Sequence, residues 1–356
     1  MIRFNNDYSE TCHESILNYI STRCVEQNPG YGTDTYCALA SDLIKKKCAC
    51  DDASVHFLVG GTQANLVLIA AALRPHQGVL AAKSAHINVH ETGSIEAVGH
   101  KILPLESADG KISAQQVRQE VALHRTSPDA EHTTQPKMVY ISNPTEYGTL
   151  YSLEQLQQLS KVCRELNLLL YVDGARLGYG LTAKGNDIQL SDLAALCDAF
   201  YIGGTKVGAL FGEAMVICNP ILEEDFRYIM KQRGGMLAKG WLLGMQFCAL
   251  FENDLYYSIA SHANKYADRI RACIAELGYN LFLPGTTNQI FVILPDTLLS
   301  CLSEKFSYSY WERFDKSNSV VRFCTSWATK DADVLALCDE LIRLTSRERK
   351  QVDYGR

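Results

Sequence analysis

A lysine among small residues is the first side chain in the sequence that could do covalent chemistry. Lys206 lies in the segment Gly203-Gly204-Thr205-Lys206-Val207-Gly208, directly after an apolar run. Most lysines are solvated surface charges, but a partly buried lysine has a lowered pKa and becomes a usable amine nucleophile. We therefore expect Lys206 to react with a carbonyl group.

An acidic residue at the end of another apolar run is the next candidate. Asp173 lies in Tyr171-Val172-Asp173-Gly174-Ala175-Arg176, where it either caps the following turn or directs its carboxylate toward a cation in a site. The interval from Asp173 to Lys206 is 206 − 173 = 33 residues. That length allows one helical crossover and a return to the neighbouring part of a sheet, so both side chains can share one site.

Two other segments offer an anion site and an imidazole. Gly60-Gly61-Thr62 ends a predicted strand just before a predicted helix, where free amides and the helix dipole could hold a phosphate. The segment lacks the lysine of a Walker loop and the third glycine of a dinucleotide fingerprint, and such a pair of glycines is more often only a turn. His86 follows another strand, and a lone histidine is more often a satisfied polar residue than a catalyst.

Together these places contain the parts that one cofactor requires. Pyridoxal 5'-phosphate needs a cradle for its phosphate, a partner for its flat ring, a carboxylate for its ring nitrogen and an amine for its aldehyde. Gly61 with Thr62, then His86, Asp173 and Lys206 could supply one part each. Because ligands of open α/β sheets bind at the carboxyl ends of the strands, the sequence predicts a pyridoxal-phosphate site there.

The elements that must position these side chains alternate between strand and helix patterns from about residue 50 to 220. Ser113 with Gln116 and Ser152 with Gln155 form capping boxes, each of which predicts the start of a helix. Such alternation predicts an α/β fold with a mostly parallel sheet and helices on both faces.

The last third of the chain has a different pattern. A long helical pattern from about Gly235 to Leu277 is followed by short strand and helix patterns, which predict a smaller α+β unit. We place the boundary near residue 250. The expected domains are a large cofactor-binding domain with an N-terminal arm over residues 1–250 and a small C-terminal α+β domain over residues 251–356.

Composition limits the partners and the compartment. The chain has 34 Lys+Arg and 40 Asp+Glu, a net charge of −6, which is the wrong sign for a nucleic-acid binder. Its first ten residues lack the apolar core of a signal peptide, and its apolar stretches are shorter than a membrane span. The 13 Cys are an odd number of scattered thiols, which favours a cytoplasmic protein without disulfides. We expect no metal site.

Longer segments resemble a known family over most of the chain. They are Asn6-Asp7-Tyr8, Gly30-Tyr31-Gly32-Thr33-Asp34, Gly61-Thr62-Gln63-Ala64-Asn65, Ala85-His86, Glu91-Thr92-Gly93, Asp173-Gly174-Ala175-Arg176-Leu177, Gly204-Thr205-Lys206 and Val321-Arg322-Phe323-Cys324-Thr325-Ser326-Trp327. These segments resemble the low-specificity L-threonine aldolases of the β-eliminating lyase group, which are fold type I pyridoxal-phosphate enzymes. The resemblance implies an aspartate-aminotransferase-like large domain with a mostly parallel sheet.

The resemblance also implies a role for each matching residue. Lys206 would bond to the cofactor aldehyde, Asp173 would pair with the ring nitrogen, and His86 would stack on the ring. The further cofactor contacts would be Gly61, Thr62, Arg176, Thr205 and Arg233, and the substrate contacts would be Asp7, Ser9, Tyr31, Arg176 and Arg322. Arg322 is our stronger choice for the substrate carboxylate, which an arginine fork binds through two parallel hydrogen bonds. The alternative for each arginine is an ordinary salt bridge.

Two segments bear on the quaternary structure. In the family, the loop that contains Tyr31 and a basic Gly-Gly segment, here Lys231-Gln232-Arg233-Gly234-Gly235, come from the partner subunit. The resemblance therefore implies a homodimer or a homotetramer with the active site at the subunit interface.

The implied reaction is a retro-aldol cleavage of L-threonine, L-allo-threonine or a related β-hydroxy amino acid to glycine and an aldehyde, in which a base takes the β-hydroxyl proton. The family usually has Asn-Thr-His after the relevant strand, whereas this chain has Asn143-Pro144-Thr145-Glu146-Tyr147-Gly148. Glu146 is our candidate for the base, directly or through water, unless the preferred side chain differs. The family's Ser-Asp-Thr appears as Asn6-Asp7-Tyr8, and Ser9 is our candidate for the missing serine.

Two other functions stay open. A pyridoxal-phosphate β-eliminating lyase or aminotransferase acting on another amino acid would use the same site, and elimination would yield ammonia and a keto acid. A non-catalytic protein that keeps the fold and an anion site is the alternative from another class. The intact Lys206 argues against it, because a binding module does not need a desolvated amine opposite an aspartate.

Overall fold

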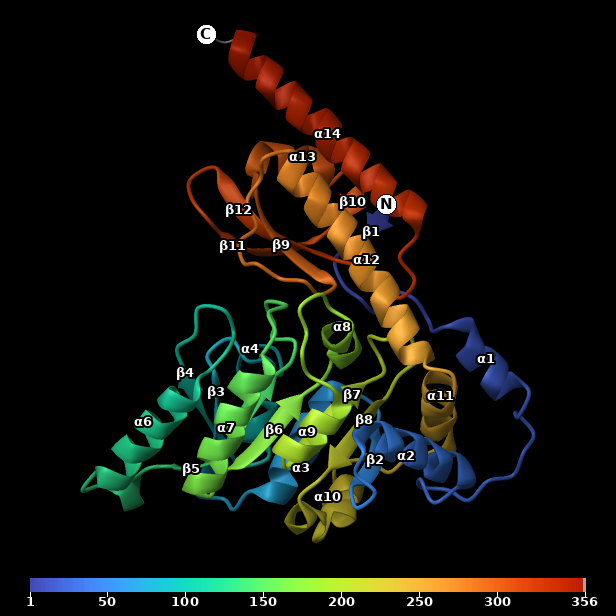
Figure 1. Cartoon of the computed structure of the whole chain (residues 1–356), viewed down its shortest axis with the longest axis vertical. Coiled ribbons are helices and arrows are strands. Elements are labelled where there is room, and N and C mark those ends of the chain that lie inside the picture. Colours follow the sequence, from blue (N-terminus) through green and yellow to red (C-terminus); the bar gives the residue numbers. More distant parts are fainter. Residues whose placement is uncertain (355–356) are drawn as a thin grey trace.

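The computed structural model describes residues 1–354, with side chains through residue 347, and a seven-stranded sheet is its largest element (Figure 1). The strands are β2 (Ser54–Leu58), β3 (Gln77–Ala82), β4 (Lys101–Leu105), β5 (Gln135–Ser142), β6 (Leu169–Asp173), β7 (Ala199–Gly203) and β8 (Glu213–Ile217). Their order is β2-β8-β7-β6-β5-β3-β4, and within this sheet only β8 runs antiparallel to its neighbours. The predicted mostly parallel sheet is confirmed.

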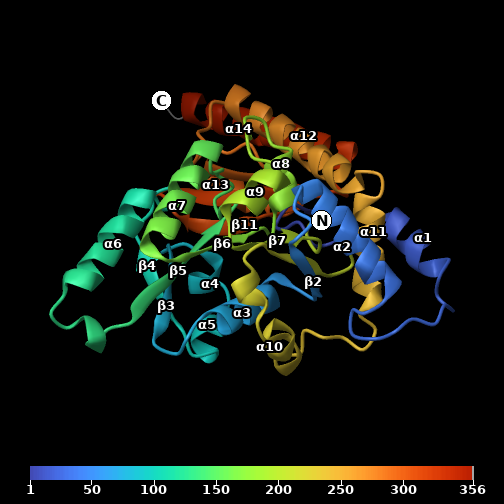
Figure 2. The same cartoon turned by 60° about the horizontal axis from the view of Figure 1, so that its bottom comes forward.

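Helices cover both faces of this sheet. They are α2 (Thr35–Cys48), α3 (Gly61–Ala72), α4 (His86–Val89), α5 (Ser94–Ala97), α6 (Ala114–Thr126), α7 (Leu153–Leu166), α8 (Leu177–Leu181), α9 (Leu190–Leu196), α10 (Phe226–Gln232) and α11 (Trp241–Phe251). Figure 2 shows α7 and α9 over one face and α3, α5 and α10 over the other. Because both faces are covered, β6 and β7 are buried at every residue and read as continuous apolar runs.

Two of the helices begin where the capping boxes predict. At the start of α6, the Ser113 hydroxyl accepts from the Gln116 amide, and the Gln116 side chain accepts from the Ser113 amide. Ser152 and Gln155 make the same reciprocal pair at the start of α7. Each pair satisfies two amides that have no partner inside the helix.

The last third of the chain forms a second unit, which lies above the large sheet in Figure 1. Its elements are α12 (Leu255–Glu276), β9 (Gln289–Pro295), α13 (Asp296–Leu302), β10 (Phe306–Ser307), β11 (Ser309–Arg313), β12 (Asn318–Cys324) and α14 (Asp331–Tyr354). Strands β11, β12 and β9 form an antiparallel sheet with its own apolar core. The α+β unit is therefore confirmed, and the domain boundary near residue 250 stays a prediction. Within residues 1–354, no helix is long and apolar enough to cross a membrane.

The long helix expected from about Gly235 to Leu277 is interrupted in the structure. Helix α11 ends at Phe251, and α12 begins after Asp254, which has a left-handed backbone with φ of 56°. Aspartate tolerates this conformation because its short side chain can bond locally to the backbone. The apolar patterns on both sides continue across so short a break, which is why the sequence reads as one helix.

The N-terminal segment packs on the second unit. Strand β1 (Ile2–Arg3) pairs in parallel with β10, and Phe4 is buried in the core of the small sheet. The Phe4 carbonyl accepts a hydrogen bond from the Cys324 amide at 2.7 Å. The chain then reaches the site described next, and it continues into helix α1 (Glu14–Ser21).

Candidate active site

The places singled out in the sequence meet at the carboxyl ends of the strands of the large sheet. The loops after β2, β3, β6 and β7 line one cavity of about 330 Å³. The cavity wall includes Gly61, Thr62, His86, Asp173, Thr205 and Lys206, together with Glu146 and Arg176. The structure therefore brings together most of the predicted cofactor residues, in a volume typical of a small-molecule site.

Lys206 lies in a closed turn between β7 and β8. The Gly204 amide donates to the Gly212 carbonyl at 3.0 Å, and the Tyr179 hydroxyl donates to the Lys206 carbonyl. Within the described residues, the Lys206 amine has no hydrogen-bond or ion-pair partner. Burial and the nearby Arg176 charge lower the pKa of this amine, so the neutral, nucleophilic form is more accessible than in a surface lysine.

Asp173, at the end of β6, is held by three side chains. The hydroxyls of Tyr140 and Tyr201 each donate to its carboxylate at 2.5 Å, and the Asn65 amide donates at 3.1 Å. Burial acts to raise the pKa of Asp173, but attraction to His86 and the tyrosine hydrogen bonds outweigh burial and lower the pKa below its ordinary value. A buried, ionised carboxylate can stabilise a protonated ring nitrogen.

His86 is oriented by a buried glutamate. Its Nδ1 lies 2.8 Å from Oε1 of Glu91, and the Asn65 amide donates to the same oxygen at 2.7 Å. Because Asn65 also donates to Asp173, one amide links Asp173 to the glutamate that holds the imidazole. The sequence segments contain Asn65 and Glu91, but this connection was not predicted.

The start of α3 forms the far end of the cavity. Its N-cap, Gly60, makes no side-chain cap hydrogen bond, so the amides of the first turn have no side-chain acceptor. A Cβ on Gly61 would lie 2.9 Å from the Tyr201 hydroxyl, which explains the glycine there. Glu213 lines the same cavity, and burial raises its pKa to about 8. Glu213 is therefore less charged at neutral pH than an ordinary glutamate and would repel a phosphate at the helix amides less.

A larger cavity of about 630 Å³ adjoins the first and shares five lining residues with it, among them His86 and Lys206. Its other wall comes from the second unit, through Trp311 on β11 and Arg322 on β12. Trp311 is the extra residue of a bulge in β11, a device that redirects a side chain. The two units together therefore enclose the space next to the Lys206 amine.

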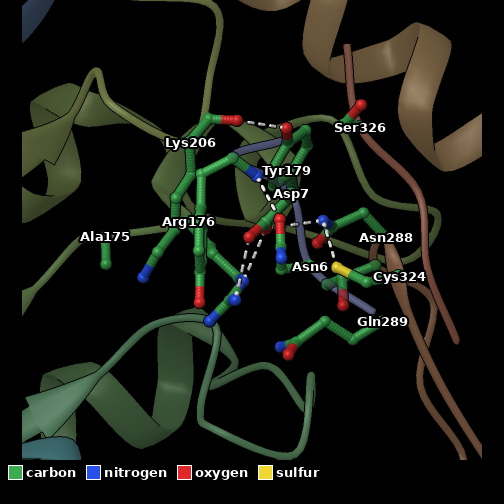
Figure 3. Close-up of polar contacts among 12 residues, drawn as sticks. Asn6, Asp7, Ala175, Arg176, Tyr179, Lys206, Asn288, Gln289, Cys324 and Ser326 are labelled. Atoms are coloured by element: carbon green, nitrogen blue, oxygen red, sulfur yellow. Dashed lines mark hydrogen bonds and ion pairs between the residues drawn. The ribbon is translucent and has the colours of Figure 1, made fainter. Parts of the chain in front are cut away.

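Arg176 is paired with an acidic residue from the N-terminal segment. Its Nε and Nη2 donate to the two oxygens of Asp7 at 2.7 and 3.0 Å, and Asn288 donates to Asp7 from the other side at 2.9 Å (Figure 3). Burial opposes ionisation of Asp7, but the charges of Arg176 and Lys206 lower its pKa to about 2. The predicted contact of Asp7 with substrate stays a prediction, since in this structure both of its oxygens are used by protein donors.

Arg322 is held only by neutral acceptors. It donates to the Gln289 amide oxygen at 3.0 Å, to the Asn5 carbonyl at 3.0 Å and to the Ser309 hydroxyl at 3.2 Å. Its Nε is buried and has no hydrogen-bond partner. A guanidinium without a counterion beside a cavity can bind a carboxylate.

Glu146 lies in both cavities, close to the imidazole loop. Its Oε1 accepts from the His86 amide at 2.9 Å and from the Ser142 hydroxyl at 2.7 Å. Burial raises the pKa of Glu146 above its ordinary value. A carboxylate with a raised pKa can exchange a proton nearer to neutral pH.

Three of the expected contacts involve residues that do not line the two cavities. Ser9 is exposed and donates to the Asn6 side chain, whereas Tyr8, which the sequence did not single out, lines both cavities. Tyr31 and Arg233 do not line either cavity of their own chain. The roles of Ser9, Tyr31 and Arg233 stay predictions.

The donor set fits pyridoxal 5'-phosphate. The aldehyde, the ring nitrogen and the phosphate of this cofactor call for an unpaired amine, an ionised carboxylate and uncapped helix amides. Lys206, Asp173 and the start of α3 present these three groups to one cavity.

Comparisons with known proteins agree with this chemistry. The family model described as beta-eliminating lyase matches residues 24–297. A low specificity L-threonine aldolase from Pseudomonas sp. (strain NCIMB 10558) is 31% identical over 314 residues, 87% of this chain and 88% of the relative. A threonine aldolase structure from Leishmania major superposes with a TM-score of 0.94 at 41% identity, covering 97% of this chain and 100% of that chain. Aspartate aminotransferase from Thermus thermophilus shares the fold alone, with a TM-score of 0.69 at 13% identity over 97% of this chain and 91% of that chain.

Proposed function

The chain belongs to the β-eliminating lyase family, and from this membership we propose that it is a carbon–carbon lyase of the threonine aldolase type. It uses pyridoxal 5'-phosphate to cleave L-threonine, L-allo-threonine or a related β-hydroxy-α-amino acid to glycine and an aldehyde. The observation that carries the proposal is the unpaired Lys206 amine beside ionised Asp173, in a cavity that adjoins the uncompensated charge of Arg322.

The proposed binding roles follow the charges of the two cavities. Lys206 would hold the cofactor through its aldehyde, Asp173 would bond to the ring nitrogen, and His86, fixed by Glu91, would stack on the ring. When bound, the cofactor supplies an electron-withdrawing ring that accepts the electron pair left on the substrate's Cα. Arg322 would bind the substrate carboxylate and so place the side chain in the larger cavity.

The proposed chemical step depends on Glu146. Its carboxylate would take the proton of the β-hydroxyl, either directly or through a water molecule, while the Cα–Cβ bond breaks and the C–O bond becomes the aldehyde carbonyl. Glu146 then gives its proton up to solvent, and one proton from solvent bonds to Cα in place of the broken C–C bond and completes glycine. This assignment replaces the family's histidine with a carboxylate whose pKa is raised above its ordinary value.

The experiment that tests the function is a visible spectrum of the purified protein before and after addition of L-threonine, L-allo-threonine and serine, with a joint assay of glycine and aldehyde. We expect a yellow protein whose spectrum shifts and which releases both products from a hydroxy amino acid. Release of ammonia and a keto acid would favour the β-eliminating alternative. A protein that stays colourless with added pyridoxal phosphate would contradict the cofactor.

We also propose that the active protein is a homodimer or homotetramer. The support is that Tyr31 is 45% exposed and that neither Tyr31 nor Arg233 lines the cavities of its own chain. A partner could present both residues to this site, as the family resemblance implies. Sedimentation of the purified protein tests the proposal, and a monomer with full activity would contradict it.

A cytoplasmic location is the last part of the proposal. All 13 cysteines lie within the described residues and are free thiols, and twelve of them are partly or fully buried. Reduced thiols of this kind are typical of a reducing compartment. Cell fractionation followed by detection of the protein tests the location.

A further inference from the structure

The surroundings of the two arginines differ in charge, although both arginines border the same space. Arg176 makes a two-point ion pair with buried Asp7, so its charge is compensated. Within the described residues, Arg322 makes no ion pair. Its three acceptors are an amide, a peptide carbonyl and a hydroxyl, which orient a guanidinium without cancelling its charge.

Gln289 is the side chain that anchors Arg322 from the first residue of β9. It is 1% exposed, and its Oε1 accepts from Nη1 of Arg322 at 3.0 Å. The opposite amide orientation would set two N–H donors against each other, so this bond fixes Oε1 toward Arg322. Two buried donors then lack an acceptor, Nε2 of Gln289 and Nε of Arg322.

A carboxylate would complete this arrangement. Gln289 lines neither cavity, so Arg322 is the group of this pair that a ligand meets, and a carboxylate has two oxygens that can accept from a guanidinium. Asn5, Ser309 and Gln289 leave the guanidinium charged, and the cavity leads from Arg322 to the Lys206 amine. The α-carboxylate of an amino acid is the anion that this position would receive.

We propose that Gln289 is a positioning residue for substrate recognition, because its neutral amide fixes Arg322 while leaving the guanidinium charge free for the substrate's α-carboxylate. A glutamate at this position would hold Arg322 at least as firmly but would cancel its charge, as Asp7 does at Arg176. An apolar residue would leave the charge but remove one of the three acceptors that fix the guanidinium. The inference rests on the proposed amino-acid substrate.

The test compares ligands with and without a carboxylate on the cofactor-loaded enzyme. Binding of glycine and of glycinamide is measured from the cofactor absorbance, and cleavage of L-threonine and L-threoninamide gives kcat and KM. The variants are Gln289→Glu, which is nearly isosteric, and Gln289→Leu. Gln135→Glu is the matched control, because Gln135 is exposed at the start of β5 and the substitution changes the net charge equally.

In Gln289→Glu we expect glycine to bind at least about tenfold more weakly, while the affinity for glycinamide changes by less than about twofold, since only glycine needs a free guanidinium charge. The KM for threonine rises by a similar factor with little change in kcat. Gln289→Leu gives the same pattern with a smaller loss, and Gln135→Glu behaves as wild type.

Two results would overturn the proposal. One is a Gln289→Glu protein that keeps the wild-type preference for glycine over glycinamide, and the other is an equal loss for both ligands, which indicates general damage. If Gln289→Glu does not fold, Gln289→Leu is measured in its place, and either of the same two results in that variant would overturn the proposal. A wild-type protein that binds glycine but releases none from threonine contradicts the proposed function and leaves the comparison at Gln289 valid.

Discussion

Burial changes the pKa of single residues in this site. Lys206 is the clearest example, since burial and Arg176 lower the pKa of an amine that has no partner in the described structure. We expect Lys206→Ala to remove both the cofactor absorbance and the cleavage activity, because no other amine takes its place. The measurement is an absorbance spectrum with a glycine assay, and a thermal melt should show that the variant is folded. Full activity in this variant would exclude the assigned role.

Glu146 carries the second residue-scale prediction. Its pKa is raised by burial, so its ionised form, which is the base, is lost as the pH falls through that raised pKa. We expect cleavage of threonine to fall on the acid side of the pH profile and Glu146→Gln to lose at least about a hundredfold in kcat, as is typical of a lost general base. An unchanged rate in Glu146→Gln would mean that another group takes the hydroxyl proton.

The sequence predicted the site residues that follow strands, but it did not predict the side chains that hydrogen-bond to those site residues. Lys206 and Asp173 could be found because carboxyl ends of parallel strands meet at one edge. Tyr140 and Tyr201 read only as apolar strand residues, yet both donate to Asp173. Their convergence depends on the strand register, with Tyr140 beside Tyr171, and register is not readable from one sequence.

At the scale of elements, the site depends on close contact between β6 and β7. A Cβ on Gly174 would lie 1.9 Å from the Tyr201 carbonyl oxygen, and the Gly174 carbonyl accepts from the Gly203 amide at 2.9 Å. We expect Gly174→Ala to lower the free energy of unfolding by about 3 kcal/mol or more, because backbone must move. Chemical denaturation measures this change. Gly60→Ala is the control, since its Cβ would meet no atom within 4 Å, and an equal loss there would contradict the steric explanation.

The elements themselves were predicted best where a local signal marks their ends. The capping boxes at Ser113 and Ser152 mark the starts of α6 and α7, as the structure confirms. The break before α12 and the short strand β11 were missed. Strand β11 has mostly exposed or half-exposed residues and a bulge at Trp311, so it lacks the alternation that identifies a strand.

At the scale of the whole molecule, Glu213 should make stability depend on pH. Its pKa in the folded protein is about 8, against an ordinary value of 4.5, so the folded state keeps a proton that the unfolded chain loses between these values. Stability therefore falls as the pH rises from 4.5 to 8, by up to about 1.4 kcal/mol per pH unit from this group. We expect Glu213→Gln to remove this fall, as measured by thermal unfolding at pH 5 and pH 8. A variant that loses stability as steeply as wild type would contradict the assignment.

The N-terminal segment has a consequence for how the protein is made. The Asn5 carbonyl accepts from Arg322, 317 positions later in the chain, and Asp7, two residues on, pairs with Arg176. The last strand of the large sheet ends at Ile217, so the ribosome releases this sheet before residue 322 is synthesised. The N-terminal segment can therefore form its contact with Arg322 only after the C-terminal unit has been translated. The large sheet can form early, but the pocket acquires its final shape only as translation finishes, and chaperones or proteases meet it incomplete until then.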